Sequence, residues 1–155
     1  MPVFESSVRS ASIATGATYS IVYNTGNTPA VFLARNVNFA GIGFIAEVYE
    51  APTGVTGGTT GVVFNSDQIL GASPRGVMTF GATVVGVGTR IAAPTYYRGT
   101  ASSNPNQVAG TFGPSAGQRR LKPNTTYLLQ FTNSDEAAQS LDVYFRWYEG
   151  ADPAP

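Results

Sequence analysis

The chain has 155 residues, with nine basic and nine acidic side chains and neither histidine nor cysteine. These absences exclude histidine general bases, thiolate nucleophiles, disulfides and the usual zinc and iron–sulfur sites. We therefore expect a protein that is not an enzyme and binds no cofactor. Charged residues make up 12% of the chain, against about 25% in a typical domain, so we expect that much of its surface is covered by partners.

The N-terminal residues 1–12 carry only scattered apolar side chains and no complete sheet face. We expect them to form an arm that adds a strand to a neighbouring molecule. The candidate contact residues in this arm are Val3, Phe4, Val8 and Arg9. Residues 13–150 then form one domain of ordinary length, and residues 151–155 form a C-terminal tail.

Apolar and polar residues alternate along most of the chain, which is the pattern of half-buried β-strands. The alternation and the intervening turns predict strands at 19–23, 30–35, 39–50, 62–65, 77–80, 83–87 and 96–98. Helical turns are possible only at 65–70 and 136–140. Residues 99–117 form a long polar loop, and a loop of that length in a compact domain is usually functional or ordered by a partner.

Two longer alternating runs, at 127–132 and 141–148, are joined by a short polar turn, which predicts a β-hairpin. Many short strands with turns about every 8–12 residues are typical of an all-β sandwich or barrel. We therefore predict an all-β fold, a single-domain jelly-roll-like β-sandwich with long end loops and the N-terminal arm. No apolar run reaches the roughly 18 residues that span a bilayer, and no signal peptide is recognisable, so we expect a soluble protein without membrane contact.

A basic segment contains Arg119, Arg120 and Lys122 just before the last two strands. It could bind an acidic partner surface or a phosphate backbone, or simply be solvated. Nucleic-acid binding normally requires a domain-wide basic excess, and here the charges balance, so we expect no direct nucleic-acid contact.

An aromatic group contains Tyr96, Tyr97 and Arg98, with Phe112 nearby in the sequence. Exposed tyrosines beside an arginine are used by carbohydrate-stacking surfaces and by protein interfaces. Paired tyrosines in a β domain, however, more often pack across strands, and this second interpretation is the one we favour.

The acidic residues show no spacing that favours catalysis or metal binding. Glu47 and Glu50 lie on one predicted strand and at its end, and Asp135 and Glu136 lie in a predicted turn. A glycosidase needs two carboxylates on either side of the bond that is cleaved, and a calcium loop needs several oxygen ligands at fixed intervals. We interpret these side chains as solvated charges and predict no metal site.

The sequence LKPNTTYLLQFTN at 121–133 is followed by VYFRWYE at 143–149, and GGTT, FN and FGATV occur at 57–60, 64–65 and 80–84. These segments resemble a family of small structural proteins of tailed bacteriophages. The resemblance covers about two thirds of the chain, and its motifs are structural rather than catalytic.

This resemblance implies a capsid decoration, or cement, protein with a jelly-roll fold. Such a subunit forms a homo-oligomer, a dimer or trimer, and binds the major capsid protein lattice on the outer surface of the virion after synthesis in the host cytoplasm. By bridging neighbouring capsomers it stabilises the assembled shell. The alternative is a carbohydrate-binding or fibre or spike β-domain of a phage particle, which has the same architecture.

Overall fold

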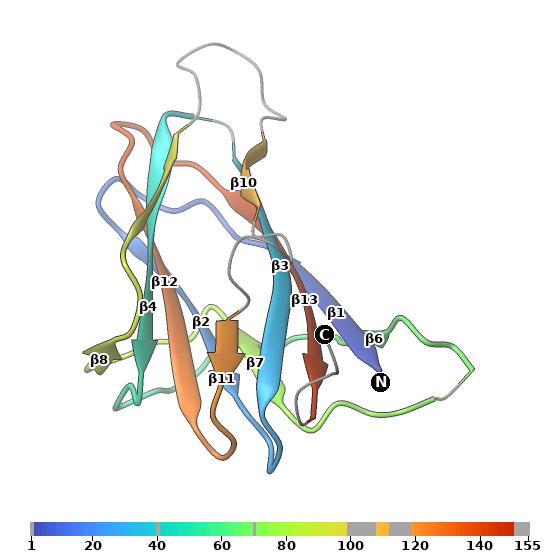
Figure 1. Cartoon of the computed structure of the whole chain (residues 1–155). Coiled ribbons are helices and arrows are strands. Elements are labelled where there is room, and N and C mark those ends of the chain that lie inside the picture. Colours follow the sequence, from blue (N-terminus) through green and yellow to red (C-terminus); the bar gives the residue numbers. More distant parts are fainter. Residues whose placement is uncertain (1, 40, 70, 99–107, 112–118, 151–155) are drawn as a thin grey trace.

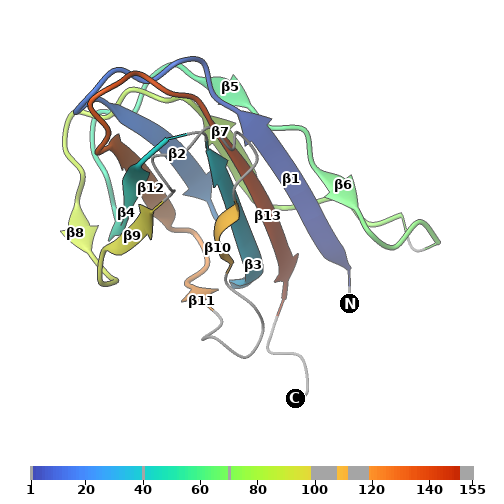
Figure 2. The same ribbon diagram turned by 90° about the horizontal axis from the view of Figure 1, so that it is seen from above.

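The computed structural model describes residues 2–39, 41–69, 71–98, 108–111 and 119–150. Within these ranges the chain forms β-strands and no helix, and the strands make two antiparallel sheets packed against each other (Figure 1). Figure 2 shows the two sheets from above, with β6 at one edge of the sandwich and β8 at the other. The predicted all-β sandwich is confirmed.

Among the described residues, the first sheet has six strands, and β11 pairs with β3 beside β10. Their order across the sheet is β10 (Val108–Thr111), β3 (Ala30–Phe39), β13 (Leu141–Glu149), β1 (Val3–Arg9) and β6 (Phe64–Asn65), and β11 (Arg119–Leu121) pairs with another part of β3. The second sheet has seven strands, and β9 pairs with β4 beside β8. Its strands are β5 (Thr59–Thr60), β7 (Val77–Phe80), β2 (Thr18–Asn24), β12 (Thr126–Asn133), β4 (Gly43–Glu50), β8 (Thr89–Arg90) and β9 (Thr95–Arg98).

The pairing of early with late strands defines the topology. β1 pairs with β13, β2 with β12, β3 with β10 and β11, and β4 with β9. The chain is therefore a nested hairpin whose halves wrap into two sheets, which is the arrangement of a jelly roll. The segment between β4 and β8 adds the short strands β5, β6 and β7 to the outer edges.

An aromatic cluster centred on Trp147 joins the two sheets. Trp147 is fully buried on β13, and its ring lies 5.4 Å from Phe32 and 6.1 Å from Phe4, both in the same sheet. Across the sandwich, the ring of Tyr23 on β2 lies 5.8 Å from Trp147 and 5.3 Å from Phe32. Aromatic pairs of this kind contribute about 0.5–1.5 kcal/mol each beyond the area that they bury.

The predicted N-terminal arm is wrong for residues 3–9. This segment is β1, and it lies between β13 and β6 in the protein's own first sheet, with Val3 opposite Tyr148 and Arg9 opposite Asp142. Phe4 is buried in the core against Trp147. The sequence pattern was misleading because β1 alternates apolar Phe4 and Val8 with buried Ser6, whose hydroxyl is satisfied by the Val62 carbonyl.

The predicted C-terminal hairpin is also wrong. Both strands exist, but β12 belongs to the second sheet and β13 to the first. Each run alternates because each strand buries one face in the same core, and that periodicity does not say which strand lies beside it. The connection 134–140 therefore crosses from one sheet to the other.

Smaller differences concern boundaries. β3 continues to Phe39, so the strand expected from 39 to 50 begins only at Gly43. The strand expected at 83–87 is reduced to isolated bridges of Thr83 and Gly86 with the loop after β4. Neither possible helical turn forms a helix among the described residues. The expected tail 151–155 and most of the expected loop 99–117 lie outside the described ranges, although β10 is a strand within that loop.

The crossover between β12 and β13 is fixed by a buried polar network. Asn133 donates to the carbonyl groups of Ile13 and Ala137, and its own side-chain oxygen accepts from Asp135 N and from Gln139. The Asp135 carboxylate accepts from the Ile42 amide at 2.9 Å. Hydrogen bonds from the Ile42 amide and then from Ala137 lower the pKa of Asp135, and burial opposes them.

We predict that Phe4→Ala lowers the free energy of unfolding by about 3–5 kcal/mol, because it leaves a cavity against Trp147 in a closely packed core. Urea unfolding measures the change. The matched control is Ser7→Ala, at an exposed position of the same strand, and it should change stability by less than about 0.5 kcal/mol. Equal stability of both variants would show that β1 does not belong to the core.

We predict that stability falls on acidification in part because Asp135 is protonated. Its pKa is lower in the folded than in the unfolded state, so its stabilisation is present above the unfolded pKa of about 4 and is lost as pH falls through the folded value. Urea midpoints measured between neutral pH and about pH 2 should show a shallower acid decline for Asp135→Asn. The exposed Glu136→Gln is the control, and an identical decline in Asp135→Asn would contradict the assignment.

Candidate functional site

The residues predicted as partner contacts lie on two opposite edges of the sandwich. The β1 group lies toward the β6 edge, and the β9 and β11 groups lie toward the edge formed by β8, β9 and β11 (Figure 2). The structure therefore does not bring them together into a single site.

On β1, the predicted contact residues are largely engaged within the protein itself. Phe4 is in the core, and Val3 and Val8 are half-buried. The Arg9 guanidinium forms an ion pair with Asp142 at 2.8 Å, which raises the pKa of Arg9. Residues 3–9 are therefore a paired strand and not a free arm. A partner could contact this strand only along its outer face.

On β9, the two tyrosines point in opposite directions, as neighbours on a strand do. Tyr96 is 66% exposed, whereas Tyr97 is 2% exposed and packs near the ring of Phe131. Arg98 is exposed, and Phe112 lies outside the described residues. Only one tyrosine is thus available for stacking, and Tyr97 fits the cross-strand packing that we favoured.

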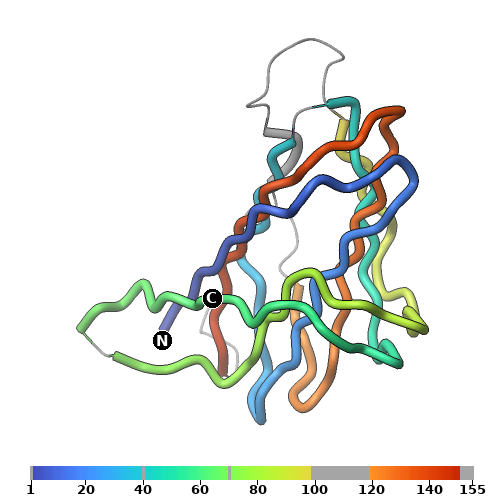
Figure 3. The backbone as a smooth tube through the Cα atoms, turned by 180° about the vertical axis from the view of Figure 1, so that it is seen from behind, coloured from blue at the N-terminus to red at the C-terminus, as the bar shows by residue number. Residues whose placement is uncertain are grey.

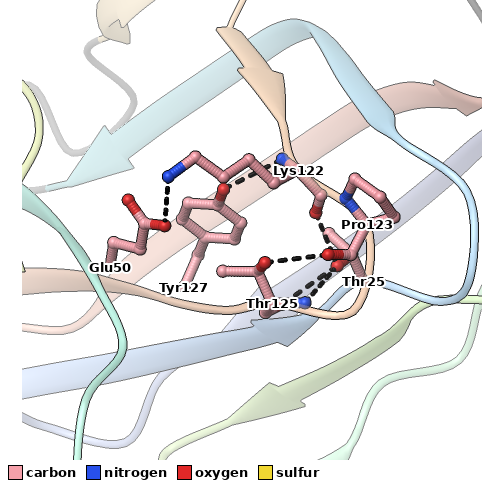
Figure 4. A network of polar contacts seen from close by, with 6 residues as sticks. All are labelled: Thr25, Glu50, Lys122, Pro123, Thr125 and Tyr127. Carbon is pink, nitrogen blue, oxygen red and sulfur yellow. Dashed lines mark hydrogen bonds and ion pairs between the residues drawn. The ribbon is translucent and has the colours of Figure 1, made fainter.

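On β11, Arg119 and Arg120 are exposed and Leu121 is buried. Lys122, which follows β11, is exposed. The Lys122 ammonium pairs with Glu50 on β4 at 2.8 Å, and the pair raises the pKa of Lys122 (Figure 4). Surface pairs of this kind contribute about 0–1 kcal/mol. Lys122 of the basic segment therefore forms an ion pair that links the two sheets.

The turn before β12 is held by a compact network, shown in Figure 4. The Lys122 amide donates to the Tyr127 hydroxyl, and the Thr25 hydroxyl bonds to the Lys122 carbonyl at 2.8 Å. The same hydroxyl accepts from the Thr125 amide. These hydrogen bonds give much of the LKPNTTY motif a structural role, which is to hold the turn between β11 and β12.

Among the described residues, the exposed apolar side chains gather most densely in residues 61–69 and 71–77, which we call the apolar loop. It runs from β5 through β6 to β7 and projects beyond the sheets in a view from behind (Figure 3). Within it Val62 is 68% exposed, Phe64 60% and Ile69 95%. We did not predict these residues as contacts, since a short apolar strand in the sequence normally indicates burial.

The apolar loop is built to hold this shape. β6 pairs with β1, and the Ser66 amide donates to the Val3 carbonyl at 2.7 Å. The Asn65 side chain donates to the Ala72 carbonyl across the base of the loop and accepts from Asp67 N. Asp67 in turn accepts from the amide of Ile69, so local side-chain turns present Ile69 to solvent.

Glu149, the last residue of β13, fastens the far end of the apolar loop. Its carboxylate accepts from the backbone amides of Arg75 at 2.6 Å and Gly76 at 3.0 Å. It also accepts from the Tyr23 hydroxyl at 3.0 Å and from Trp147 at 3.3 Å. Burial and, next, the nearby Glu149 charge raise the pKa of Tyr23, which keeps this phenol a donor.

The described residues contain no cluster of three acidic side chains that could hold a metal ion. In the same ranges no helix is suited to cross a membrane. No known family model matches the chain, and no characterised protein matches it by sequence. The exposed side chains of Val62, Phe64 and Ile69 make the apolar loop, with the neighbouring face of β1, the candidate contact surface.

We predict that Glu149→Ala releases the apolar loop and lowers the free energy of unfolding by about 1.5–3 kcal/mol, because it leaves buried donors without their charged acceptor. Limited proteolysis should cut the variant within 61–77 faster than the wild type, and urea unfolding should report the stability. Glu136→Ala, an exposed carboxylate, is the control. Wild-type cleavage rates in Glu149→Ala would contradict this role.

Proposed function

We propose that this protein is a capsid decoration protein, which binds the outside of an assembled phage head and stabilises the shell by bridging capsomers. It acts in the virion as a homo-oligomer, with the major capsid protein lattice as its partner. The proposal is supported by the jelly-roll topology, the resemblance of the C-terminal segments to phage structural proteins, and the apolar loop.

The apolar loop is the observation that carries this proposal. An ordered loop that presents Val62, Phe64 and Ile69 to solvent is unfavourable for an isolated molecule, and exposed apolar patches commonly mark interfaces. Burying each such side chain contributes about 1.5–3 kcal/mol. The hydrogen bonds of Asn65, Asp67 and Glu149 hold the loop before a partner arrives, so less entropy is lost on binding.

The low charge of the chain suits a subunit that is packed against neighbours. With nine positive and nine negative side chains, little net repulsion opposes close packing of many copies on one surface. A protein that binds the assembled lattice and not free capsid subunits shifts the equilibrium toward the closed shell by mass action.

The alternative, a carbohydrate-binding or fibre domain, has one favourable observation. Tyr96 is exposed on β9 beside the exposed Arg98, and a single ring of this kind can stack on a sugar. The burial of Tyr97 removes the second ring of the platform that the sequence suggested, so the contact surface at the apolar loop supports decoration better.

We predict that purified protein co-sediments in stoichiometric amounts with expanded heads of the phage that encodes it, and that Ile69→Asp weakens this binding at least about tenfold. Phe64→Ser should act in the same direction. Val85→Asp is the matched control, because Val85 is 85% exposed but lies in another loop, against Gly54.

Two outcomes would overturn parts of this proposal. Wild-type protein that fails to sediment with heads, but binds glycans through Tyr96, would favour the carbohydrate-binding alternative. Undiminished binding by both Ile69→Asp and Phe64→Ser, with wild-type urea midpoints, would place the contact surface elsewhere on the protein.

A further inference from the structure

A cavity of about 340 Å³ lies between the two sheets, near the edge where β9 and β11 face each other. Its walls are mainly apolar and come from both sheets, including Phe32 and Phe145 on one side and Ile21, Val48 and Met78 on the other. Native interiors contain few voids larger than a water molecule. The volume lies at the lower end of the range of about 300–1,000 Å³ that is usual for small-molecule sites.

A β-bulge in β3 turns a charged side chain into this cavity. Phe32 pairs with Trp147 and Ala34 with Arg146, so Leu33 has no opposite residue on β13. The extra residue reverses the alternation, and Arg35 consequently lies on the inner face, opposite Phe145. Uninterrupted alternation from Phe32 would have directed Arg35 to the outside.

Arg35 is 8% exposed, lines the cavity and donates from Nε to the Tyr97 hydroxyl at 3.0 Å. Its guanidinium also lies 5.7 Å from the centre of the Tyr97 ring. Burial lowers the pKa of Arg35, the Tyr97 hydroxyl opposes this effect, and the charge of Arg119 lowers the pKa further. Arg35 and Arg119 both line the cavity, so two positive charges face the same space.

Arg119 stands at the mouth of the same cavity. It lines the cavity together with Leu121, two residues along β11, whereas Arg120 between them does not, as strand alternation requires. Its side chain donates to the Ile91 carbonyl at 3.3 Å, across the opening between the two sheets. None of the described residues that line the cavity is acidic.

We propose that this inter-sheet cavity binds a small amphipathic anion, with its apolar body between the sheets and its anionic head at Arg35 and Arg119. An anion there would pair with both positive charges, and its attraction to the buried Arg35 is stronger than it would be in water. The apolar walls provide favourable burial for a hydrocarbon chain. A medium-chain carboxylate such as decanoate has both properties and is small enough to serve as the probe.

The single tryptophan offers a direct readout, because Trp147 stacks on Phe32, a wall residue, at 5.4 Å. Titration of the full-length protein with decanoate at neutral pH should give a saturable change in tryptophan fluorescence below millimolar concentration. Decanol and decyltrimethylammonium have the same chain with a neutral or a cationic head, and both should bind at least about tenfold more weakly.

Matched variants locate the site. Arg119→Gln should weaken decanoate at least about tenfold, whereas its neighbour Arg120→Gln should bind as the wild type does. Val48→Phe fills the cavity and should abolish binding. Ala93→Phe, at the exposed rim, tests the same point if Val48→Phe does not fold.

Absence of saturable decanoate binding, or equal binding of the three head groups, would overturn the proposal. So would Arg119→Gln and Arg120→Gln variants that weaken decanoate equally, because that result indicates non-specific attraction to a basic surface. Binding only to anionic lipid vesicles, and not to free decanoate, would also count against it. These outcomes are independent of capsid binding, since the apolar loop lies at the opposite edge.

Discussion

The contact between Trp147 and its aromatic neighbours is the interaction on which the rest of the structure depends. Phe4 and Phe32 bring β1 and β3 to this ring from its own sheet, and Tyr23 brings β2 from the other. Glu149, two residues farther along β13, accepts hydrogen bonds from Tyr23 and Trp147 and also from Gly76 at the C-terminal end of the apolar loop. The core and the proposed contact surface therefore share one strand.

The two edges of the sandwich differ because different kinds of segment complete them. On one side the segment between β4 and β8 includes β6, which pairs with Phe4 and Glu5 of β1 and covers that part of the sheet edge. That covering segment carries the exposed Phe64 and Ile69. On the other side β9 and β11 belong to different sheets, and the cavity with Arg35 lies between them. One edge is thus suited to a macromolecular surface and the other to a small ligand.

Much of the fold could be predicted from the sequence, because alternation reports which faces are buried. The strand at Tyr19–Tyr23 and the two C-terminal strands were found in this way. The partners of β12 and β13 could not be found, because the strands beside them, β2 and β4 for β12 and β1 and β3 for β13, are distant in the sequence. The sites were harder to predict. Exposure of Ile69 depends on side-chain turns, and the inward position of Arg35 depends on a bulge that leaves no periodic signal.

The bulge at Leu33 has a consequence for how this strand tolerates changes in length. Phe32 and Arg35 already face the same interior on either side of it, and each is in register with β13. Removing Leu33 would leave both halves of β3 paired as they are and would restore regular alternation between them. Elsewhere in a paired strand, loss of one residue turns every later side chain to the opposite face. Deletion of Leu33 should therefore keep the inward-facing residues of β3 facing inward. The strand would lose only the local twist that a bulge adds.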